Sequence, residues 1–328
     1  MPSCRGILVT MSKGTVPIYH VFAALADGYI SFSLTGPMEI LYRLSMESIR
    51  TLRIMQETSK RRLFQGKTIG LVPTMGALHK GHLGLVKRAK NENDIVVVSI
   101  FVNPIQFGQN EDFDKYPRDR EGDMEKLKKE GADILFIPDV KAMYPEGFST
   151  TVTVGGLSDR LCGAFRPGHF AGVATVVCKL FNSVKPTRAY FGQKDFQQTV
   201  VIRRMTEDLN MDLELVICPT VRESDGLAMS SRNAYLNAAE RKAAAALYRA
   251  LLSAAETAKA GSSARPPDIK DHLIAALKGE QLISEIQYAG AYDPATLEEL
   301  PEFKRQNLFA LAVKIGGTRL IDNVMVDL

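Results

Sequence analysis

The feature that most constrains the fold of this chain is a regular alternation of short apolar runs with amphipathic or charged helical segments. The run at 95–101 (IVVVSIF) is apolar on both faces, which is typical of a strand in a parallel sheet covered by helices on both sides. The same order recurs up to about residue 220, so the sequence predicts an α/β fold with a doubly wound parallel sheet. The expected strands are 68–72, 95–101, 133–137, 187–191 and 213–218, and the expected helices are 46–64, 82–90, 120–130, 171–184 and 195–209.

The pattern changes near residue 220. Asn237 and Glu240 have the spacing of a capping box, which predicts an Ala-rich helix over 238–259. The GSSARPP stretch at 261–267 reads as a short linker. Strand-like runs follow at 284–288, 308–314 and 318–326. We therefore expect a first domain over 46–220 and a second, smaller C-terminal α/β domain over 221–328.

Residues 1–45 differ from the remainder, with only five charged side chains and no clean period. One reading is a signal peptide, although Pro17 and His20 interrupt its apolar run. We favour the alternative, an atypical N-terminal extension that is disordered or arises from a start codon assigned too early. The true start would then be Met38 or Met46.

Composition and charge exclude several classes of protein. The 328 residues include 41 basic and 37 acidic side chains, and a net charge of +4 is too small to indicate a nucleic-acid partner, although it suits a small anionic substrate. No stretch reaches the roughly 18 to 20 apolar residues of a membrane helix. The four cysteines form neither CxxC nor a zinc-ligand spacing, so we expect a reducing, cytoplasmic location without a membrane partner.

The stretch 73–82 (PTMGALHKGH) leaves an expected strand and enters an expected helix. Backbone N–H groups and the dipole at a helix start favour a phosphate, and Gly76 and Gly81 would let the backbone approach it. His79 and His82, three residues apart on one face, could then donate to phosphate oxygens as charge develops. A capped helix start with a solvated histidine is the plain alternative. A shared zinc ion is another, although no third ligand is evident nearby.

A second polar stretch, 99–108 (SIFVNPIQFG), follows the next strand. The amides of Asn103 and Gln106 could hydrogen-bond a carboxylate or hydroxyl without adding charge. The alternative is a capped turn around the Asn-Pro pair.

A third stretch, 191–198 (FGQKDFQQ), again follows a strand and opens a helix. Lys194 is a point charge suited to phosphate. Asp195 would either cap the helix or hold a ribose hydroxyl.

A fourth stretch, 221–233 (VRESDGLAMSSRN), lies at the expected junction of the two domains. The hydroxyls of Ser230 and Ser231 and the guanidinium of Arg232 make a clamp for an anion. The position of this clamp at a domain junction favours a ligand-binding function, because ligand sites occur preferentially in the crevices between domains.

Together and in this order, the four motifs resemble those of the pantothenate synthetase (pantoate–β-alanine ligase) family, within the HxGH nucleotidyltransferase superfamily. The resemblance runs from about Met46 to the C-terminus. It implies a cytoplasmic homodimer with a Rossmann-like ATP-binding domain and a smaller C-terminal lid domain. The implied reaction is the ATP-dependent condensation of pantoate with β-alanine through a pantoyl-adenylate, with release of pyrophosphate and AMP. Mg²⁺ would be held mainly by the ATP phosphates, without a dedicated protein site.

The resemblance also implies roles for particular residues. The catalytic positions would be His79, His82, Lys194 and Arg232, with His82 the proton donor. The ATP contacts would be Met75, His79, His82, Gly192, Lys194, Asp195, Val221, Met229, Ser230, Ser231 and Arg232. Pantoate would be held by Gln106 and Gln198, with Met75 near it.

Two other functions remain as alternatives. Another HxGH-type nucleotidyltransferase would need basic residues for a second phosphate, whereas Gln106 and Gln198 predict a neutral, carboxylate-sized pocket. A non-catalytic nucleotide-binding protein would be expected to lack His82, Lys194 or Arg232, all of which are present.

Overall fold

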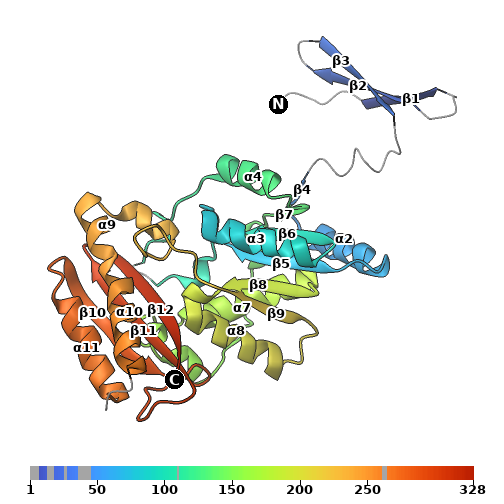
Figure 1. The fold of residues 1–328 in the computed structure, drawn as a ribbon. Coiled ribbons are helices and arrows are strands. Elements are labelled where there is room, and N and C mark those ends of the chain that lie inside the picture. The colour runs from blue at the N-terminus through green and yellow to red at the C-terminus, as the bar shows by residue number, and fades with distance from the viewer. Residues whose placement is uncertain (1–6, 13–17, 26–27, 36–45, 109–110, 261–263) are drawn as a thin grey trace. The chain divides into compact units, whose positions relative to one another are not determined.

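The structure is a computed structural model that describes residues 7–12, 18–25, 28–35, 46–108, 111–260 and 264–328. The chain divides into two compact units, residues 1–47 and 48–328 (Figure 1). In the first unit, β1 (Ile7–Ser12), β2 (Ile18–Leu25) and β3 (Gly28–Thr35) pair antiparallel in that order. These strands are the described part of the extension, whose expected disorder stays a prediction. The start at Met38 or Met46 stays a prediction.

The second unit is built on a six-stranded sheet in the order β4-β7-β6-β5-β8-β9, and all pairings from β7 to β9 are parallel. The expected doubly wound α/β fold is confirmed. Strand order reverses at β5, which places the carboxyl ends of β5, β6 and β8 at a switch point where such sheets bind ligands. The strands are β4 (Glu47–Ile49), β5 (Ile69–Thr74), β6 (Ile95–Ile100), β7 (Ile134–Phe136), β8 (Arg188–Gly192) and β9 (Glu214–Cys218).

Helices cover both faces of this sheet. α3 packs on β5, β6 and β8 and contacts α4, while α7 packs on β5 and contacts both α2 and α8. The crossovers β5–α3–β6 and β8–α8–β9 run to opposite sides of the switch point, so right-handed connections place α3 and α8 on opposite faces. The helices are α2 (Leu52–Phe64), α3 (Lys80–Glu92), α4 (Arg120–Lys129), α5 (Val140–Met143), α6 (Cys162–Phe165), α7 (His169–Val184) and α8 (Phe196–Asp208).

The helix expected over 46–64 begins later than predicted, at Leu52. Ile49 is buried in the edge strand β4, and its carbonyl accepts a hydrogen bond from the N–H of Ile137 beyond β7. Thr51 then caps α2, because its Oγ1 accepts from the N–H of Ile54. The helical period of the sequence therefore included a residue that belongs to the sheet.

The C-terminal part has an antiparallel sheet of β10 (Ile283–Tyr292), β11 (Gln306–Ile315) and β12 (Thr318–Asp327). α10 packs on β11 and β12, and α11 packs on β10. The remaining helices are α9 (Ala238–Ala244), α10 (Ala246–Lys259) and α11 (Pro266–Lys278).

Two expectations for this part need correction. The Ala-rich helix is split at Ala245 into α9 and α10, although Asn237 and Glu240 form the expected capping box. The expected linker over 261–267 is shorter, because Pro266 is the first residue of α11, a position that proline favours. Residues 261–263 lie outside the described residues.

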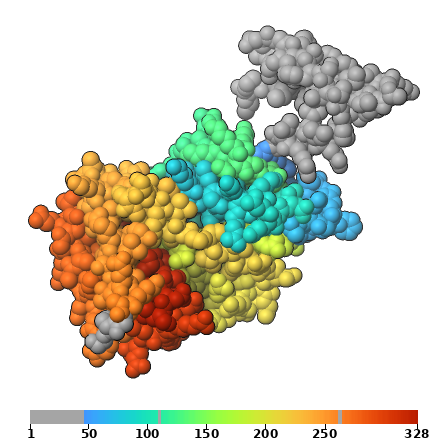
Figure 2. All heavy atoms as spheres, viewed as in Figure 1, coloured from blue at the N-terminus to red at the C-terminus, as the bar shows by residue number. Residues whose placement is uncertain are grey.

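Residues 48–328 contain two large apolar clusters. One, with Leu71, Val97 and Phe136, lies within the parallel sheet and its helices, and the other, with Leu247 and Leu311, lies between α9–α11 and the antiparallel sheet. Figure 2 shows the same division on the surface, with the orange and red C-terminal residues gathered on one side of this unit. Among the described residues, no helix combines the length and hydropathy needed to cross a bilayer.

Candidate active site

An open cleft with about 1370 Å³ of empty space lies at the carboxyl ends of β5, β6 and β8. The loop after β9 forms another wall of it. Every residue that the sequence predicted for the site lines this cleft: Met75, His79, His82, Gln106, Gly192, Lys194, Asp195, Gln198, Val221, Met229, Ser230, Ser231 and Arg232. The fold therefore brings together site residues from four motifs that lie as far apart in sequence as Met75 and Arg232, while the ligand of each residue stays a prediction.

His79 and His82 stand at the start of α3. Nδ1 of His79 accepts a hydrogen bond from the N–H of Gly81 at 3.2 Å, and Nδ1 of His82 accepts from the N–H of His79 at 3.4 Å. Because a backbone N–H only donates, each ring carries its proton on Nε2 when neutral. The same two histidines therefore cap the helix start and supply N–H donors at the cleft. The capping hydrogen bonds at Nδ1 determine that the proton of each neutral ring is on Nε2.

Both imidazoles are neutral at pH 7. Burial lowers the pKa of His79 to about 4, with a further contribution from the charge of Lys194. Burial also lowers the pKa of His82 to about 3, and the neighbouring His79 adds to this shift. The two rings are 4.0 Å apart between centroids. They can donate N–H hydrogen bonds without bringing a positive charge.

Gly81 is required by the packing of the motif. A Cβ at this position would lie 2.9 Å from Cε1 and Nδ1 of the His79 ring. Gly76 has φ +86°, a left-handed conformation that favours glycine. The two glycines therefore let the chain turn and let His79 fold back over the helix start.

The buried carboxylate of Asp123 in α4 holds the loop before α3. It accepts hydrogen bonds from the N–H groups of Ala77, at 2.8 Å, and Leu78, at 2.7 Å. Lys126 donates to the carbonyl oxygen of Leu78 and lies 3.5 Å from Asp123. Asp123 was missed in the sequence, because its partners are about 45 residues away and it lies in a charged helix with no distinguishing local pattern.

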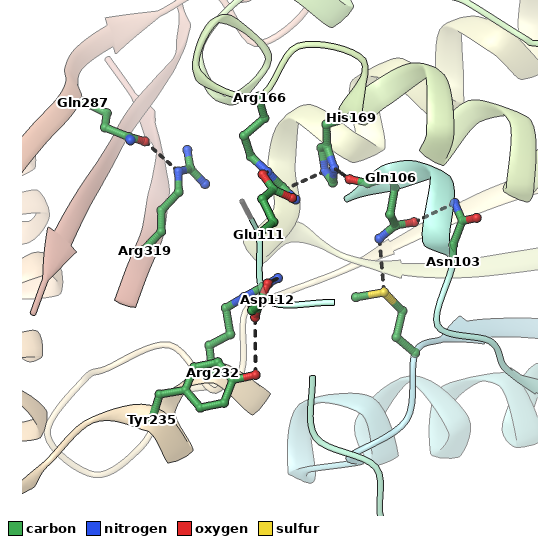
Figure 3. Close-up of polar contacts among 11 residues, drawn as sticks. Asn103, Gln106, Glu111, Asp112, Arg166, His169, Arg232, Tyr235, Gln287 and Arg319 are labelled. Carbon is green, nitrogen blue, oxygen red and sulfur yellow. Dashed lines mark hydrogen bonds and ion pairs between the residues drawn. The ribbon is translucent and has the colours of Figure 1, made fainter. Parts of the chain in front are cut away.

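Gln106 is buried and its amide is held on both sides. Its Oε1 accepts from Nδ2 of Asn103 at 3.0 Å, and its Nε2 donates to the sulfur of Met75 at 3.1 Å (Figure 3). Asn103 in turn accepts from the hydroxyl of Tyr144 at 2.7 Å and donates to the carbonyl of Gly172 at 3.0 Å. Asn103 therefore orients Gln106, and the alternative of a side-chain cap on the Asn-Pro turn is not what the structure has.

Lys194 and Asp195 lie in the turn between β8 and α8. Asp195 makes no side-chain cap on α8; its Oδ1 lies 3.6 Å from Nζ of Lys194. Burial would raise the pKa of Asp195, but the charges of Lys194 and Arg232 outweigh it and lower that pKa below its usual value. Asn323 of β12 donates to the carbonyls of Gln193 and Lys194, so the C-terminal sheet holds this turn in place.

Two arginines of the cleft are paired with carboxylates of the segment after β6. Arg232 makes two hydrogen bonds of 2.9 Å to Asp112, and Arg166 makes two of 2.5 Å to Glu111 (Figure 3). His169 lies between Arg166 and the carbonyl of Gln106, at 3.0 Å and 2.8 Å. An entering anion must therefore compete with Asp112 for the guanidinium of Arg232.

The other predicted residues complete the walls. Ser230 accepts from the N–H of Arg232 at 3.3 Å, and Ser231 shares a hydrogen bond of 3.0 Å with the hydroxyl of Tyr116. A Cβ at Gly192 would meet no atom within 4 Å, so the backbone there is open to close approach by a ligand. Among the described residues, no group of three or more His, Cys, Asp or Glu could hold a metal ion, which leaves the zinc alternative without support.

Comparison with known proteins decides between the alternatives. The model of the Pantoate-beta-alanine ligase family matches residues 47–325. A pantothenate synthetase of Thermodesulfovibrio yellowstonii is 62% identical over 282 residues, which cover 86% of this chain and 100% of that protein. The chain belongs to the pantoate–β-alanine ligase family. Its activity is the ATP-dependent ligation of pantoate and β-alanine.

Solved structures of pantoate–β-alanine ligases share the fold. The pantothenate synthetase of Thermus thermophilus has a TM-score of 0.80 and 46% identity, covering 85% of this chain and 99% of that one. The pantoate–β-alanine ligase of Francisella tularensis, complexed with β,γ ATP and β-alanine, has a TM-score of 0.71 and 33% identity. The match covers 86% of this chain and 98% of that one.

Two residues that stabilise the ligase site could be identified only from the tertiary structure. The buried Asp322 of β12 accepts two hydrogen bonds from Arg222, at 2.6 and 2.9 Å, and so ties the loop after β9 to the C-terminal sheet. Asn323 next to it holds the Lys194 turn. The pair lies 100 residues or more from its partners and inside a strand that reads as ordinary β structure, so no local signal marks it.

Proposed function

We propose that the cleft performs the ligation in two steps. In the first, a carboxylate oxygen of pantoate forms a bond to the α-phosphorus of ATP, the bond to the bridging oxygen breaks, and pyrophosphate leaves. In the second, the neutral amine of β-alanine forms a bond to the acyl carbon, the bond from that carbon to the phosphate oxygen breaks, and AMP leaves. The proton lost by the amine passes to solvent. Neither step needs a covalent bond to the protein, so positioning and charge stabilisation account for the rate.

The triphosphate would lie between the start of α3 and the turn before α8. His79 and His82 would donate neutral Nε2–H hydrogen bonds to phosphate oxygens, while Lys194 and Arg232 would supply the positive charge. In the protein without nucleotide, burial lowers the pKa of His82 to about 3, so its neutral ring would meet an entering phosphate as an Nε2–H hydrogen-bond donor. The observation that carries this assignment is the convergence of all four motifs on one cleft.

Pantoate would lie deeper, between the amides of Gln106 and Gln198. The wall there is apolar and includes Val176, Val177 and Phe191, which suits a branched hydrocarbon. Asn103 holds Gln106 in one orientation, so the amide can recognise a hydroxyl or carboxylate with little loss of rotamer entropy.

Mg²⁺ would bind chiefly through phosphate oxygens and water. Most groups at the phosphate end, two imidazoles, a lysine and an arginine, complement phosphate but are not the oxygen ligands that Mg²⁺ prefers. Asp195 is the one carboxylate among the described lining residues, and it lies 3.6 Å from Nζ of Lys194. The ion would neutralise phosphate charge when bound, and the chain's own residues would orient the nucleotide.

The assembly would be a cytoplasmic homodimer. The basis is the resemblance to the ligase family, and the free thiols of Cys162, Cys178 and Cys218 suit a reducing compartment. Cys4 lies outside the described residues. Sedimentation equilibrium should give twice the 36.1 kDa chain mass, and a monomer across micromolar concentrations would refute the dimer.

Isotope exchange tests the two-step route. Pantoate alone should support exchange of labelled pyrophosphate into ATP, and AMP release should need both pantoate and β-alanine. Lys194→Ala should reduce the exchange by about 100-fold or more, because it removes a charge from the phosphate site. Lys60→Ala on the exposed face of α2 is the matched control and should behave as the unaltered enzyme. Exchange that requires β-alanine would exclude a pantoyl-adenylate.

A further inference from the structure

A second hollow adjoins the cleft, between the first turn of α8 and the C-terminal sheet. Its lining shares Arg166, His169, Lys194, Asp195, Gln198, Ser230 and Arg232 with the cleft, so the two spaces lie directly next to each other. Its far end is formed by Cys162, Tyr288 and Arg319, which come from α6, β10 and β12. Neither the sequence motifs nor the two-step scheme uses this end of the hollow.

Arg319 has fewer partners than its charge requires. Its Nε donates to Oε1 of Gln287 at 2.6 Å (Figure 3), and the guanidinium also interacts with the side chains of Cys162 and Tyr288, which are not carboxylates. Its Nη2 is buried and has no hydrogen-bond partner in the part of the chain that the structure describes. A buried donor left unpaired is costly, and a buried cation more so, unless an anion binds it.

The other arginines around these two spaces differ from Arg319 in this respect. Arg166 is paired with Glu111, and Arg232 is paired with Asp112, each through two hydrogen bonds. Within the described part of the chain, Arg319 is the arginine of the two linings that faces no carboxylate within 4 Å. It is therefore the guanidinium best able to take a carboxylate from a substrate.

The surroundings of Arg319 suit a short amino acid. The hydroxyl of Tyr288 and the sulfur of Cys162 are 3.1 Å apart beside it, and Leu161, Phe196 and Leu308 line the hollow. An apolar wall strengthens a charge pair by keeping water away, and it complements two methylene groups. Gln198 lines both spaces, so an amine at that end of the hollow would face the acyl group in the cleft.

We propose that Arg319, with Tyr288 and Cys162 beside it, forms a carboxylate subsite that holds the carboxylate of β-alanine while its amine points to the cleft. Arg319 is then a specificity-determining residue for the second substrate. The inference rests on the ligation activity and on the cleft as the place of acyl transfer, but it does not depend on the adenylate intermediate.

The unaltered enzyme provides the first test, with β-alaninamide as a neutral analogue of β-alanine. The enzyme should prefer β-alanine in kcat/KM by about 100-fold, since the charge-assisted hydrogen bond to arginine is lost with the amide. Equal use of the two amines, within threefold, would overturn the subsite without any substitution.

Arg319→Gln provides the second test. The KM for β-alanine should rise by about 100-fold, and the preference over β-alaninamide should fall to within a few-fold. The KM for ATP and pantoate-dependent pyrophosphate exchange should stay within threefold of the unaltered enzyme. Arg319→Lys should give an intermediate KM for β-alanine, because it keeps the charge and loses the planar fork. Arg305→Gln, at an exposed position outside both linings, is the matched control.

Two results would overturn the proposal. One is an unchanged KM for β-alanine in Arg319→Gln together with an unchanged preference for the carboxylate. The other is a rise in the KM for ATP as large as that for β-alanine, which would place Arg319 at the nucleotide. Failure of pantoate-dependent exchange in the unaltered enzyme would reject the adenylate route alone, since the selectivity between the two amines is measured in the complete reaction.

Discussion

At the residue scale, the HxGH motif works through the mutual fit of its members. Each histidine accepts a backbone N–H at Nδ1, which leaves the Nε2 proton available to the cleft. The glycine between them has no side chain to collide with the first ring. The motif is therefore specific because capping, tautomer and packing all depend on the same four residues.

Gly81→Ala should lower kcat/KM by about 10-fold or more while leaving the fold intact. The added Cβ would lie 2.9 Å from the His79 ring and would push it away from the phosphate position. Gly84→Ala in the same helix is the control, because its Cβ would meet nothing closer than 3.9 Å. It should keep full activity and gain roughly 0.5 to 1 kcal/mol of stability, as alanine favours a helix. Steady-state kinetics and urea unfolding of both variants would check this, and equal activity of the two would contradict it.

The buried histidines predict a pH dependence of stability. Burial lowers the pKa of His79 and His169 to about 4 and that of His82 to about 3, whereas an unfolded histidine titrates near 6.5. The unfolded chain therefore binds protons first as the pH falls. The stability due to the neutral rings is complete above about pH 6.5 and is lost as the pH falls towards 4.

Urea unfolding between pH 7 and 5 measures this effect. The free energy of unfolding should fall by at most about 1.4 kcal/mol per pH unit for each of the three histidines. In the variant His79→Gln/His82→Gln/His169→Gln, the dependence between pH 6.5 and 5 should be clearly flatter. Identical slopes for the two proteins would show that the rings are protonated in the folded state.

At the scale of elements, the site depends on how loops are held at the carboxyl ends of strands. The loop between β5 and α3 is fixed by Asp123 of α4, and the turn between β8 and α8 is fixed by Asn323 of β12. Each loop is thus held by a side chain from a different element. A catalytic group placed on such a loop keeps its position without being part of a regular element.

Asp123→Asn should reduce kcat/KM by about 10-fold and stability by about 1 to 3 kcal/mol. The amide replaces a charged acceptor that holds the N–H groups of Ala77 and Leu78. Asp119→Asn is the matched control, since Asp119 caps the same helix from an exposed position and asparagine caps equally well. Thermal unfolding and steady-state kinetics would check both variants. Loss of stability without loss of activity would show that the loop does not need this carboxylate.

The sequence predicted most helices and strands as the correct type of element, but it did not predict well where they begin and end. The strand at 95–101 and the helix at 120–130 were found within a residue, because a continuous apolar run and a charged amphipathic segment carry strong local signals. Ile49 was assigned to a helix and lies in a strand, since its periodicity fitted α2 and its partner β7 is 85 residues away. The break at Ala245 within the Ala-rich segment likewise has no local marker.

At the scale of the whole molecule, residues 48–328 form a compact unit of their own. The matched relatives align with about 86% of this chain and cover 100% of their own length in the case of Thermodesulfovibrio yellowstonii. A variant that starts at Met46 should therefore keep kcat and every KM within about twofold, since all of the site residues lie after that position. Steady-state kinetics with all three substrates would check this. A large loss of activity would give the N-terminal strands a role in catalysis.

The sequence by itself determined the family, the α/β class and the members of the cleft. It could do so because the motifs are short, local and joined to strand ends, and because parallel strands bring those ends to one edge of the sheet. Tertiary structure alone decided the properties of these groups: the neutral state of His79 and His82, the carboxylates that pair with Arg166 and Arg232, and, among the described residues, the lack of a carboxylate partner for Arg319. These properties come from burial, ion pairs and hydrogen bonds between residues that lie 40 to 130 positions apart, and a local sequence pattern does not reveal such contacts.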